Sequence, residues 1–468
     1  MKTVMKVNGV DAVNAAAYDM NAADGACDMK KNDEEMISAL LRLIKIKSVK
    51  YDGLTAGEYT PQPGKPFGEG IAHTLEEALA LCKSLGMRVK NCDGYAGYAE
   101  VGDGDEMMGI LMHLDVVPEG GGWDYPPYGG EICDGRLYGR GAVDDKGPAA
   151  ATIFALKELM DEGFEFGKRV RLIFGCDEEN DWECMDHYKA HEECPDFGFT
   201  PDADFPMIYG EMGILGADFV VYLPEDDSSV ITGGEASNAV PAYCKAQVMT
   251  ESGVAEITGE GVAAHASLPH EGRNAISDAM KKLGDIRDTL TCSEELKSFI
   301  DFYNDKIGFA LHGEKIGCGF EDAETGKLTF NAGMIRTVDG AVRMSVDMRV
   351  PVTVDKNEVI GNLQAAAAEY GVSLENTDFM EPVFSSLDSH LANVLMDVYR
   401  EATGDDTEPM TMGGGTYARA MDNVVAYGPL FPGREATEHM TNEYILVEDL
   451  VKIKAIYKEA IRRLAGCE

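Results

Sequence analysis

The sequence predicts an α/β fold in which a main domain, with a central mixed sheet flanked by helices, is interrupted by an inserted α+β domain. In the first and last parts of the chain, apolar strand-like runs alternate with helical segments, which is typical of a sheet covered by helices. The pattern changes near Met212 and resumes near Ser389. A chain of 468 residues is also too long for one ordinary core. We therefore assign residues 1–211 and 385–468 to the main domain and 212–384 to the insert.

The elements of the main domain follow from periodicity and from helix start and stop signals. Residues 1–30, rich in Ala, Asn and Asp, are predicted to be a loose extension. Thr74 and Glu77 have the spacing of a capping box, which predicts a helix start, and Gly86 predicts the end of that helix. The other expected helices begin near Asn32 and cover 149–162, 391–401 and 447–464, and strands are expected near Arg88, Tyr98 and Ile110 and over 169–174.

The insert contains strand-like runs at 218–223, 242–249 and 342–350, with helices over 275–283 and 356–370. A single ferredoxin-like unit with two helices needs roughly 80 to 110 residues, whereas the insert is about twice as long. We therefore expect an α+β domain made of two ferredoxin-like subdomains, although no internal sequence repeat supports this division.

Composition excludes several classes of function. The formal net charge is −41, from 41 basic and 82 acidic residues, so nucleic acids and anionic membranes are not expected as partners. The chain has no run of eighteen apolar residues and no apolar segment typical of a signal peptide. Its eleven scattered cysteines form no C-x-x-C pair, which suits reduced thiols. The expected location is therefore the cytoplasm.

One short stretch, Leu111 to Asp115, is the starting point for a functional interpretation. It contains His113 and Asp115 and follows an apolar run that is expected to form a buried strand. Residues two apart point to the same side of a strand. An imidazole supported by a neighbouring carboxylate is a common arrangement at metal sites. The alternative is an ordinary His-x-Asp at the surface end of a strand.

Further candidate ligands occur along the chain, and several follow predicted strands. Together with His113 they form a set of two histidines and three carboxylates. Such a set suits Zn(II), Mn(II) or Co(II) better than Ca(II) or Mg(II). Five ligands are enough for two metals if one carboxylate bridges them. Glu178, next to Glu179, would then be available as a general base, although a solvated acidic turn remains the alternative. The candidate metal ligands are His113, Asp144, Glu179, Asp202 and His439.

Four motifs resemble the signatures of the M20 metallopeptidases: His113-Leu114-Asp115, Gly139-Arg140-Gly141-x-x-Asp144-Asp145-Lys146-Gly147, Asp177-Glu178-Glu179, and Gly261-x-x-Ala264-His265-Ala266-Ser267-x-Pro269. The match covers almost the whole chain after residue 30. Within that family the chain is most similar to the dipeptidase V branch, because of the long insert, the 200–206 segment and the 413–419 loop.

The resemblance implies a role for each matching residue. His113 and Asp202 would hold one metal, and Glu179 and His439 the other. Asp144 would bridge the two metals, with Asp145 as its rival. The remaining implied roles are orientation of His113 by Asp115, general base and acid chemistry by Glu178, stabilisation of the oxyanion by His265, and binding of the substrate carboxylate by Asn238, Arg349 and the turn of Gly413, Gly414 and Gly415.

The resemblance further implies a cytoplasmic, monomeric dipeptidase with two divalent cations, Zn(II) or Mn(II). A metal-bridging hydroxide would attack the peptide carbonyl of a dipeptide with free N- and C-termini, with the insert acting as a lid. Two alternatives remain open at this point. The same site could hydrolyse N-acyl amino acids, as a deacylase or desuccinylase, or the chain could be a non-catalytic binding protein on an inactive peptidase fold.

Overall fold

The computed structural model describes residues 30–54 and 57–467, which form two compact units. The first unit contains the described residues up to Tyr209 together with 385–410 and 416–467, and the second contains 210–384 and 411–415. The sequence placed the insert at 212–384 and did not anticipate that the short 411–415 segment packs with it. Apart from Lys30, the extension predicted for residues 1–30 lies outside the described residues.

The first unit is built on a mixed sheet, six strands of which run in the order β1-β2-β6-β3-β7-β23. Strands β6, β3, β7 and β23 are parallel to one another, whereas β2 pairs antiparallel with β6, and β1 antiparallel with β2, at one edge. β3 is buried along its whole length, as expected for a central strand. The strand bounds are β1 Arg88–Cys92, β2 Ala96–Val101, β3 Met107–His113, β6 Arg169–Gly175, β7 Phe197–Thr200 and β23 Val424–Ala426.

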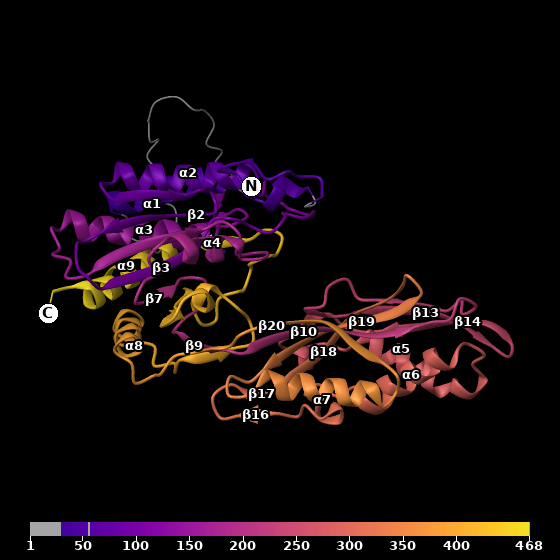
Figure 1. Cartoon of the computed structure of the whole chain (residues 1–468). Helices are drawn as coiled ribbons and strands as arrows, with labels where there is room; N and C mark the ends of the chain where they lie inside the picture. Colours follow the sequence, from indigo (N-terminus) through magenta and orange to yellow (C-terminus); the bar gives the residue numbers. More distant parts are fainter. Residues whose placement is uncertain (1–29, 55–56, 468) are drawn as a thin grey trace. The chain divides into compact units, whose positions relative to one another are not determined.

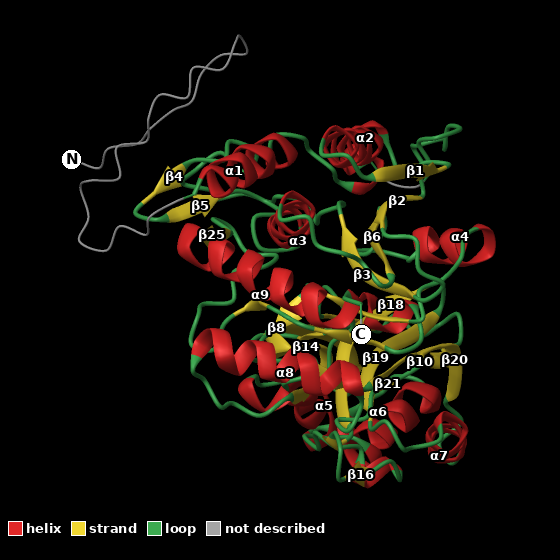
Figure 2. Cartoon of the chain, turned by 90° about the vertical axis from the view of Figure 1, so that its left-hand side faces the viewer, coloured by secondary structure: helices red, strands yellow, loops and turns green. Residues whose placement is uncertain are grey.

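Helices cover this sheet on both faces. In Figure 2, α1, α3 and α9 lie together on one side of β3 and β6, and α4 lies on the other side. α3 packs between α1 and α9, so its Ala-rich sequence is buried almost throughout. The helix bounds are α1 Lys31–Ile44, α2 Glu69–Ser84, α3 Lys146–Asp161, α4 Glu183–His191, α8 His390–Thr403 and α9 Val447–Ala465.

The predicted start of α2 is wrong. The helix begins at Glu69, and Thr74 lies in its interior, where its hydroxyl donates to the carbonyl of Gly70. The first amides of the helix are capped instead by the carboxylate of Asp52, which accepts from the N–H groups of Glu69 and Gly70. A cap from a residue so far back in the chain leaves no local sequence signal. The predicted end at Gly86 is confirmed, with φ of 94° at that glycine.

The second unit contains one antiparallel sheet of seven strands in the order β14-β13-β11-β18-β19-β10-β20. Helices α5, α6 and α7 all lie against one face of this sheet (Figure 1). Alternate residues of β10, such as Leu215, Ala217 and Phe219, are buried beneath them. The bounds are β10 Gly213–Tyr222, β11 Val230–Gly233, β13 Tyr243–Thr250, β14 Gly253–Glu260, α5 Ala275–Asp285, α6 Glu294–Lys306, β18 Thr329–Val338, β19 Ala341–Val350, α7 Lys356–Ala368 and β20 Ser373–Met380.

The prediction of two ferredoxin-like subdomains is corrected by this topology. Strands β10, β18, β19 and β20, taken as first to fourth, lie in the order 4-1-3-2 with antiparallel neighbours, which is one ferredoxin-like unit. The extra length forms β11, β13 and β14, which extend the same sheet beyond β18, and α5, which covers that extension. One continuous core therefore serves the whole sheet.

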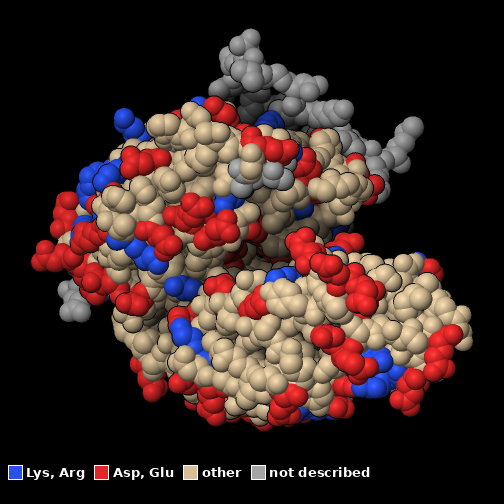
Figure 3. Space-filling model, turned by 45° about the vertical axis from the view of Figure 1, so that its right-hand side comes forward, with Lys and Arg blue, Asp and Glu red and all other residues tan. Residues whose placement is uncertain are grey.

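The surface agrees with the acidic composition. On the face shown in Figure 3, Asp and Glu side chains are far more widespread than Lys and Arg. Most basic side chains in the first unit are used in ion pairs, for example Lys90 with Glu192 and Arg169 with Glu193. Among the described residues, no helix is both long enough and apolar enough to span a lipid bilayer.

Candidate metal centre

The site begins where three neighbouring parallel strands end. His113 is the last residue of β3, Glu178 and Glu179 follow β6, and Asp202 follows β7. Because β6, β3 and β7 are adjacent and parallel, their carboxyl ends lie at one edge of the sheet, where α/β proteins place their chemistry. Asp144 joins them from the loop before α3.

Asp144 connects two histidines that are more than 300 positions apart in the chain. Its Oδ1 lies 2.8 Å from Nε2 of His113, and its Oδ2 lies 3.0 Å from Nε2 of His439. The same nitrogen of His439 lies 3.0 Å from Oε2 of Glu179, and Nε2 of His113 lies 3.6 Å from Oδ2 of Asp202. The five predicted ligands therefore meet at one place, with one carboxylate shared between the two imidazoles.

Burial and crowding perturb the pKa values of this cluster. Burial raises the pKa of Glu179 to about 7 and, together with neighbouring carboxylates, raises the pKa of Glu178 well above its usual range. Hydrogen bonds that the imidazole donates to the carboxylates of Asp144 and Glu179 raise the pKa of His439 to about 11. Burial opposes protonation of His113, but Asp202 and the surrounding hydrogen bonds raise its pKa nonetheless. The cluster thus has an excess of negative charge that favours cations.

The supporting contact of Asp115 differs from the expected one. Nδ1 of His113 lies 2.9 Å from the backbone carbonyl of Asp115 and 3.6 Å from its carboxylate. That carboxylate instead accepts the backbone N–H groups of Glu178 and Glu179, each at 3.1 Å. The reason is that β3 ends at His113, so strand alternation no longer applies to Asp115. Asp115 consequently orients His113 through its carbonyl and the Glu178–Glu179 turn through its side chain.

These residues fit divalent cations by their donor set. Ligand atoms of His113, Asp144 and Glu179 lie within 4.8 Å of one another, and so do those of His113, Glu178 and Asp202. Imidazole nitrogen combined with carboxylate oxygen suits Zn(II) and Mn(II). A proton on Nδ1 of His113, donated to the Asp115 carbonyl, leaves Nε2 as the ligand atom. Asp145, the rival bridge, instead accepts the backbone N–H of His113 with Oδ2.

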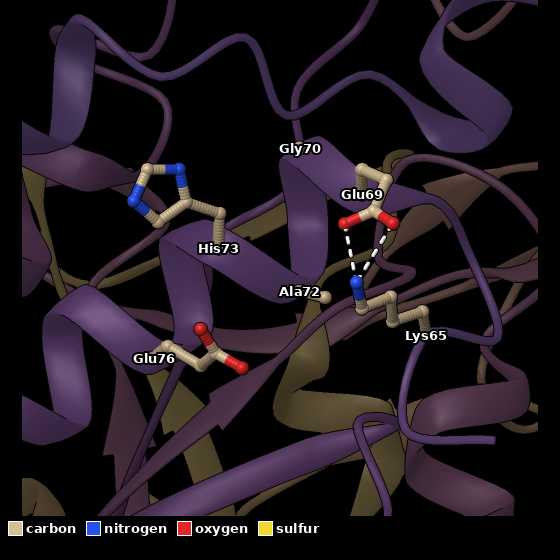
Figure 4. A pocket seen from close by; sticks show the side chains of 6 residues that line it. All are labelled: Lys65, Glu69, Gly70, Ala72, His73 and Glu76. Carbon is tan, nitrogen blue, oxygen red and sulfur yellow. Dashed lines mark hydrogen bonds and ion pairs between the residues drawn. The ribbon is translucent and has the colours of Figure 1, made fainter. Parts of the chain in front are cut away.

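Two other features of the first unit carry weaker signals. The carboxylates of Asp177, Asp181 and Glu183 also cluster, but the ammonium of Lys50 lies 2.9 Å from Asp177 and 2.7 Å from Asp181, so this cluster already holds a cation. An open surface pocket lies along the start of α2 (Figure 4). The ammonium group of Lys65, which lines this pocket, is paired with the carboxylate of Glu69. The pocket is lined by Lys65, Glu69, Gly70, Ala72, His73 and Glu76.

The second unit contains the residues expected to bind substrate. β12 (Ala239–Val240) pairs with β15 (Ala264–His265), so that Ala239 lies opposite His265. The carbonyl of Asn238 accepts the N–H of Ala266 in the same ladder, which brings Asn238 and His265 together. His265 is exposed, and its Nδ1 lies 2.6 Å from the hydroxyl of Ser267.

Arg349 is buried and is held by an acid that the sequence interpretation missed. Its Nε and Nη2 donate to the two carboxylate oxygens of Asp347 at 2.7 and 3.0 Å, and its Nη1 donates to the carbonyl of Gly413. A Cβ at Gly413 would lie 2.8 Å from that of Ser267, so only glycine fits this close approach. Within the second unit, His265, Ser267, Gly413 and Arg349 therefore form one connected patch.

Several residues of the candidate metal centre and of the Arg349 patch were not found from the sequence. Asp347 could have been, because residues two apart on β19 share a face. Trp182, whose indole N–H donates to the carbonyl of Glu178 at 2.7 Å, gave no signal beyond being one of two tryptophans. Glu443, a buried acid close after His439 in the chain, has contacts that become visible only in the folded chain.

Comparison with known proteins finds relatives that align along almost the whole chain. "Putative dipeptidase YtjP" of Bacillus subtilis is 36% identical over 467 residues, covering 93% of this chain and 98% of that protein. A "Putative dipeptidase" of Staphylococcus epidermidis is 34% identical, with 92% and 97% covered.

Solved structures share the fold at low sequence identity. The dipeptidase Dug1p from Saccharomyces cerevisiae has a TM-score of 0.58 at 13% identity, with 92% of this chain and 96% of that chain covered. Human carnosine dipeptidase 1 has a TM-score of 0.56 at 16% identity, with 92% and 98% covered. The profile of "Peptidase family M20/M25/M40" matches residues 109–463, which include every predicted metal ligand. The chain therefore belongs to the M20 peptidase family.

Proposed function

We propose that this protein is a dipeptidase of the dipeptidase V branch, dependent on two divalent cations, Zn(II) or Mn(II). The observation that carries the proposal is the position of Asp144, whose two oxygens lie within 3.0 Å of the imidazoles of His113 and His439. Such a carboxylate, with further acids beside each imidazole, suits a bridge between two cations. The names of the B. subtilis and S. epidermidis relatives support a dipeptide as substrate.

The residues divide the chemistry between them. His113 and Asp202 would hold one cation, Glu179 and His439 the other, and Asp144 would contact both. When bound, the cations would polarise the peptide carbonyl and lower the pKa of water at the site. Glu178 lies beside these ligands without being needed as one, and its raised pKa suits it to take a proton from the attacking water and return it to the leaving amine.

Substrate recognition is assigned to the second unit. Arg349 uses three of its five N–H groups on Asp347 and Gly413, which fixes the plane of its guanidinium. We assign the two remaining N–H groups, one on each Nη, to the carboxylate of the substrate, with Asn238 and the Gly413–Gly415 turn contributing further contacts. His265 would donate to the oxyanion.

The direct test is hydrolysis of a dipeptide panel by protein stripped of metal and then refilled with Zn(II) or Mn(II). We expect turnover only after refilling, and little activity on acetylated or succinylated amino acids. Preference for the acylated compounds would replace the dipeptidase proposal with an amidohydrolase, and no hydrolysis of either class would favour a binding protein. Light scattering and cell fractionation test the accompanying proposals of a monomer located in the cytoplasm.

A further inference from the structure

Glu443 makes an unusual set of contacts beside the candidate metal centre. Its side chain is fully buried, and both carboxylate oxygens are used. Oε2 accepts from Nη1 of Arg140 at 2.7 Å and from the N–H of Gly141 at 3.1 Å. Oε1 accepts from the N–H groups of Val143 at 3.0 Å and Asp144 at 3.3 Å. Four donors thus converge on one carboxylate, and three of them are backbone amides of the segment that ends at Asp144.

The same carboxylate is connected to the segment that carries His439. Nη2 of Arg140 donates to the carbonyl of His439 at 3.3 Å and to that of Pro118 at 3.5 Å. The Cζ atom of Arg140 also lies 5.3 Å from the centre of the Trp123 ring, and this cation–π contact helps to fix the plane of the guanidinium. Arg140 is only 2% exposed, so its charge needs a partner within the protein, and Glu443 supplies it.

A small sheet fixes the register of this arrangement. β5 (Arg136–Tyr138) pairs with β25 (Tyr444–Leu446), with Tyr138 opposite Tyr444, and the N–H of Gly139 donates to the carbonyl of Glu443. Asp144 follows β5 in the chain and His439 precedes β25, so the two segments diverge from the same end of this small sheet. Glu443 lies where these two segments separate.

We infer that Glu443 is a positioning residue of the two-cation site, which sets the segment of Asp144 directly and the segment of His439 through Arg140. This inference rests on the proposed function. Asp144 is the one carboxylate within 3.0 Å of both imidazoles among the described residues, so a shift of its segment would disturb both cation positions together. Supporting contacts of this kind typically change metal affinity about 10- to 100-fold.

The test uses Glu443→Gln in the full-length chain. The amide keeps one acceptor oxygen but turns an NH₂ group toward N–H donors, so two of the four contacts are lost. The matched control is Glu100→Gln, because Glu100 is also buried and pairs with a buried arginine, Arg171, at 2.6 Å, but on β2 and β6. Mn(II) binding to the metal-stripped proteins is measured by electron paramagnetic resonance of the free ion, and stability by calorimetry.

We expect both variants to lose thermal stability, and only Glu443→Gln to bind Mn(II) at least 10-fold more weakly than the unsubstituted protein. Binding by Glu443→Gln within threefold of the unsubstituted protein, or an equal loss in Glu100→Gln, would overturn the inference. If Glu443→Gln does not fold, Arg140→Lys decides by the same criterion, because lysine keeps the charge but lacks the fork that reaches His439. Absence of both Mn(II) and Zn(II) binding by the unsubstituted protein would instead contradict the proposed function.

Discussion

Replacing Asp115 with asparagine separates its contribution to the site from its contribution to stability. The side chain of Asp115 is fully buried, and its two oxygens accept the N–H groups of Glu178 and Glu179 at 3.1 Å each. Asparagine keeps one acceptor and turns an NH₂ group toward the other N–H. A hydrogen bond to a charged group contributes about 1.5–3 kcal/mol, so we expect Asp115→Asn to lower the free energy of unfolding by that amount.

The second unit offers a matched control. The carboxylate of Asp227 also accepts two backbone N–H groups, from Ser229 at 2.9 Å and Ser293 at 2.8 Å, but in the second unit, which contains none of the proposed metal ligands. At ~2–4 °C per kcal/mol, both Asp115→Asn and Asp227→Asn should lower the Tm of the unit that contains them by about 3–12 °C. Only Asp115→Asn should also weaken cation binding and slow turnover, because it displaces Glu178 and Glu179.

The assay combines calorimetry, Mn(II) titration and the rate of dipeptide hydrolysis for the two variants. We expect a loss of about 10-fold or more in cation affinity for Asp115→Asn and less than twofold for Asp227→Asn. The reasoning is refuted if Asp115→Asn binds and hydrolyses like the unsubstituted protein, or if both variants lose affinity to the same extent.

Three further predictions concern the same chemistry. Cation affinity should rise with pH from about 5.5 to 8.5, because Glu179 and His439, with pKa values of about 7 and 11, must lose protons to bind a cation. Calorimetric titration in buffers of different ionisation enthalpy should detect this proton release. Binding that does not depend on pH would contradict the prediction. Glu178→Gln should retain both cations but lower kcat by about 10²-fold or more, measured by metal analysis and steady-state kinetics, and unchanged kcat would remove Glu178 from the mechanism. Arg349→Lys should lower kcat/KM for free dipeptides but not for C-terminally amidated ones, and an equal loss on both would exclude carboxylate recognition.

The first unit could be predicted well because its signals are local. Apolar runs followed directly by His113 and by Glu178–Glu179 indicated both the strands and the position of the chemistry at their carboxyl ends. The parallel pairing of β6, β3 and β7 then brings those ends together. His439, a candidate ligand outside this sheet, was proposed by residue type alone, and the family resemblance then assigned it to a metal, because no local pattern links that loop to the strands.

The contacts that could not be predicted join segments far apart in the sequence. Asp52 caps α2, Glu443 holds the segment of Asp144, and the carboxylate of Asp115 binds two amides about 60 residues later. Each is an ordinary carboxylate in the sequence, and only the tertiary fold supplies its donors. The insert was misjudged for a related reason: its length indicated extra structure, but strand pairing decides whether such structure forms a second subdomain or extends the first sheet.

We propose that the Asp144 carboxylate would contact two cations, one beside His113 and one beside His439. Crystals of the protein grown with Mn(II) and measured by anomalous diffraction test this directly. We expect two anomalous peaks about 3.5–4 Å apart on either side of the Asp144 carboxylate, one beside each imidazole. A single peak, or peaks that leave Asp144 uncoordinated, would contradict it.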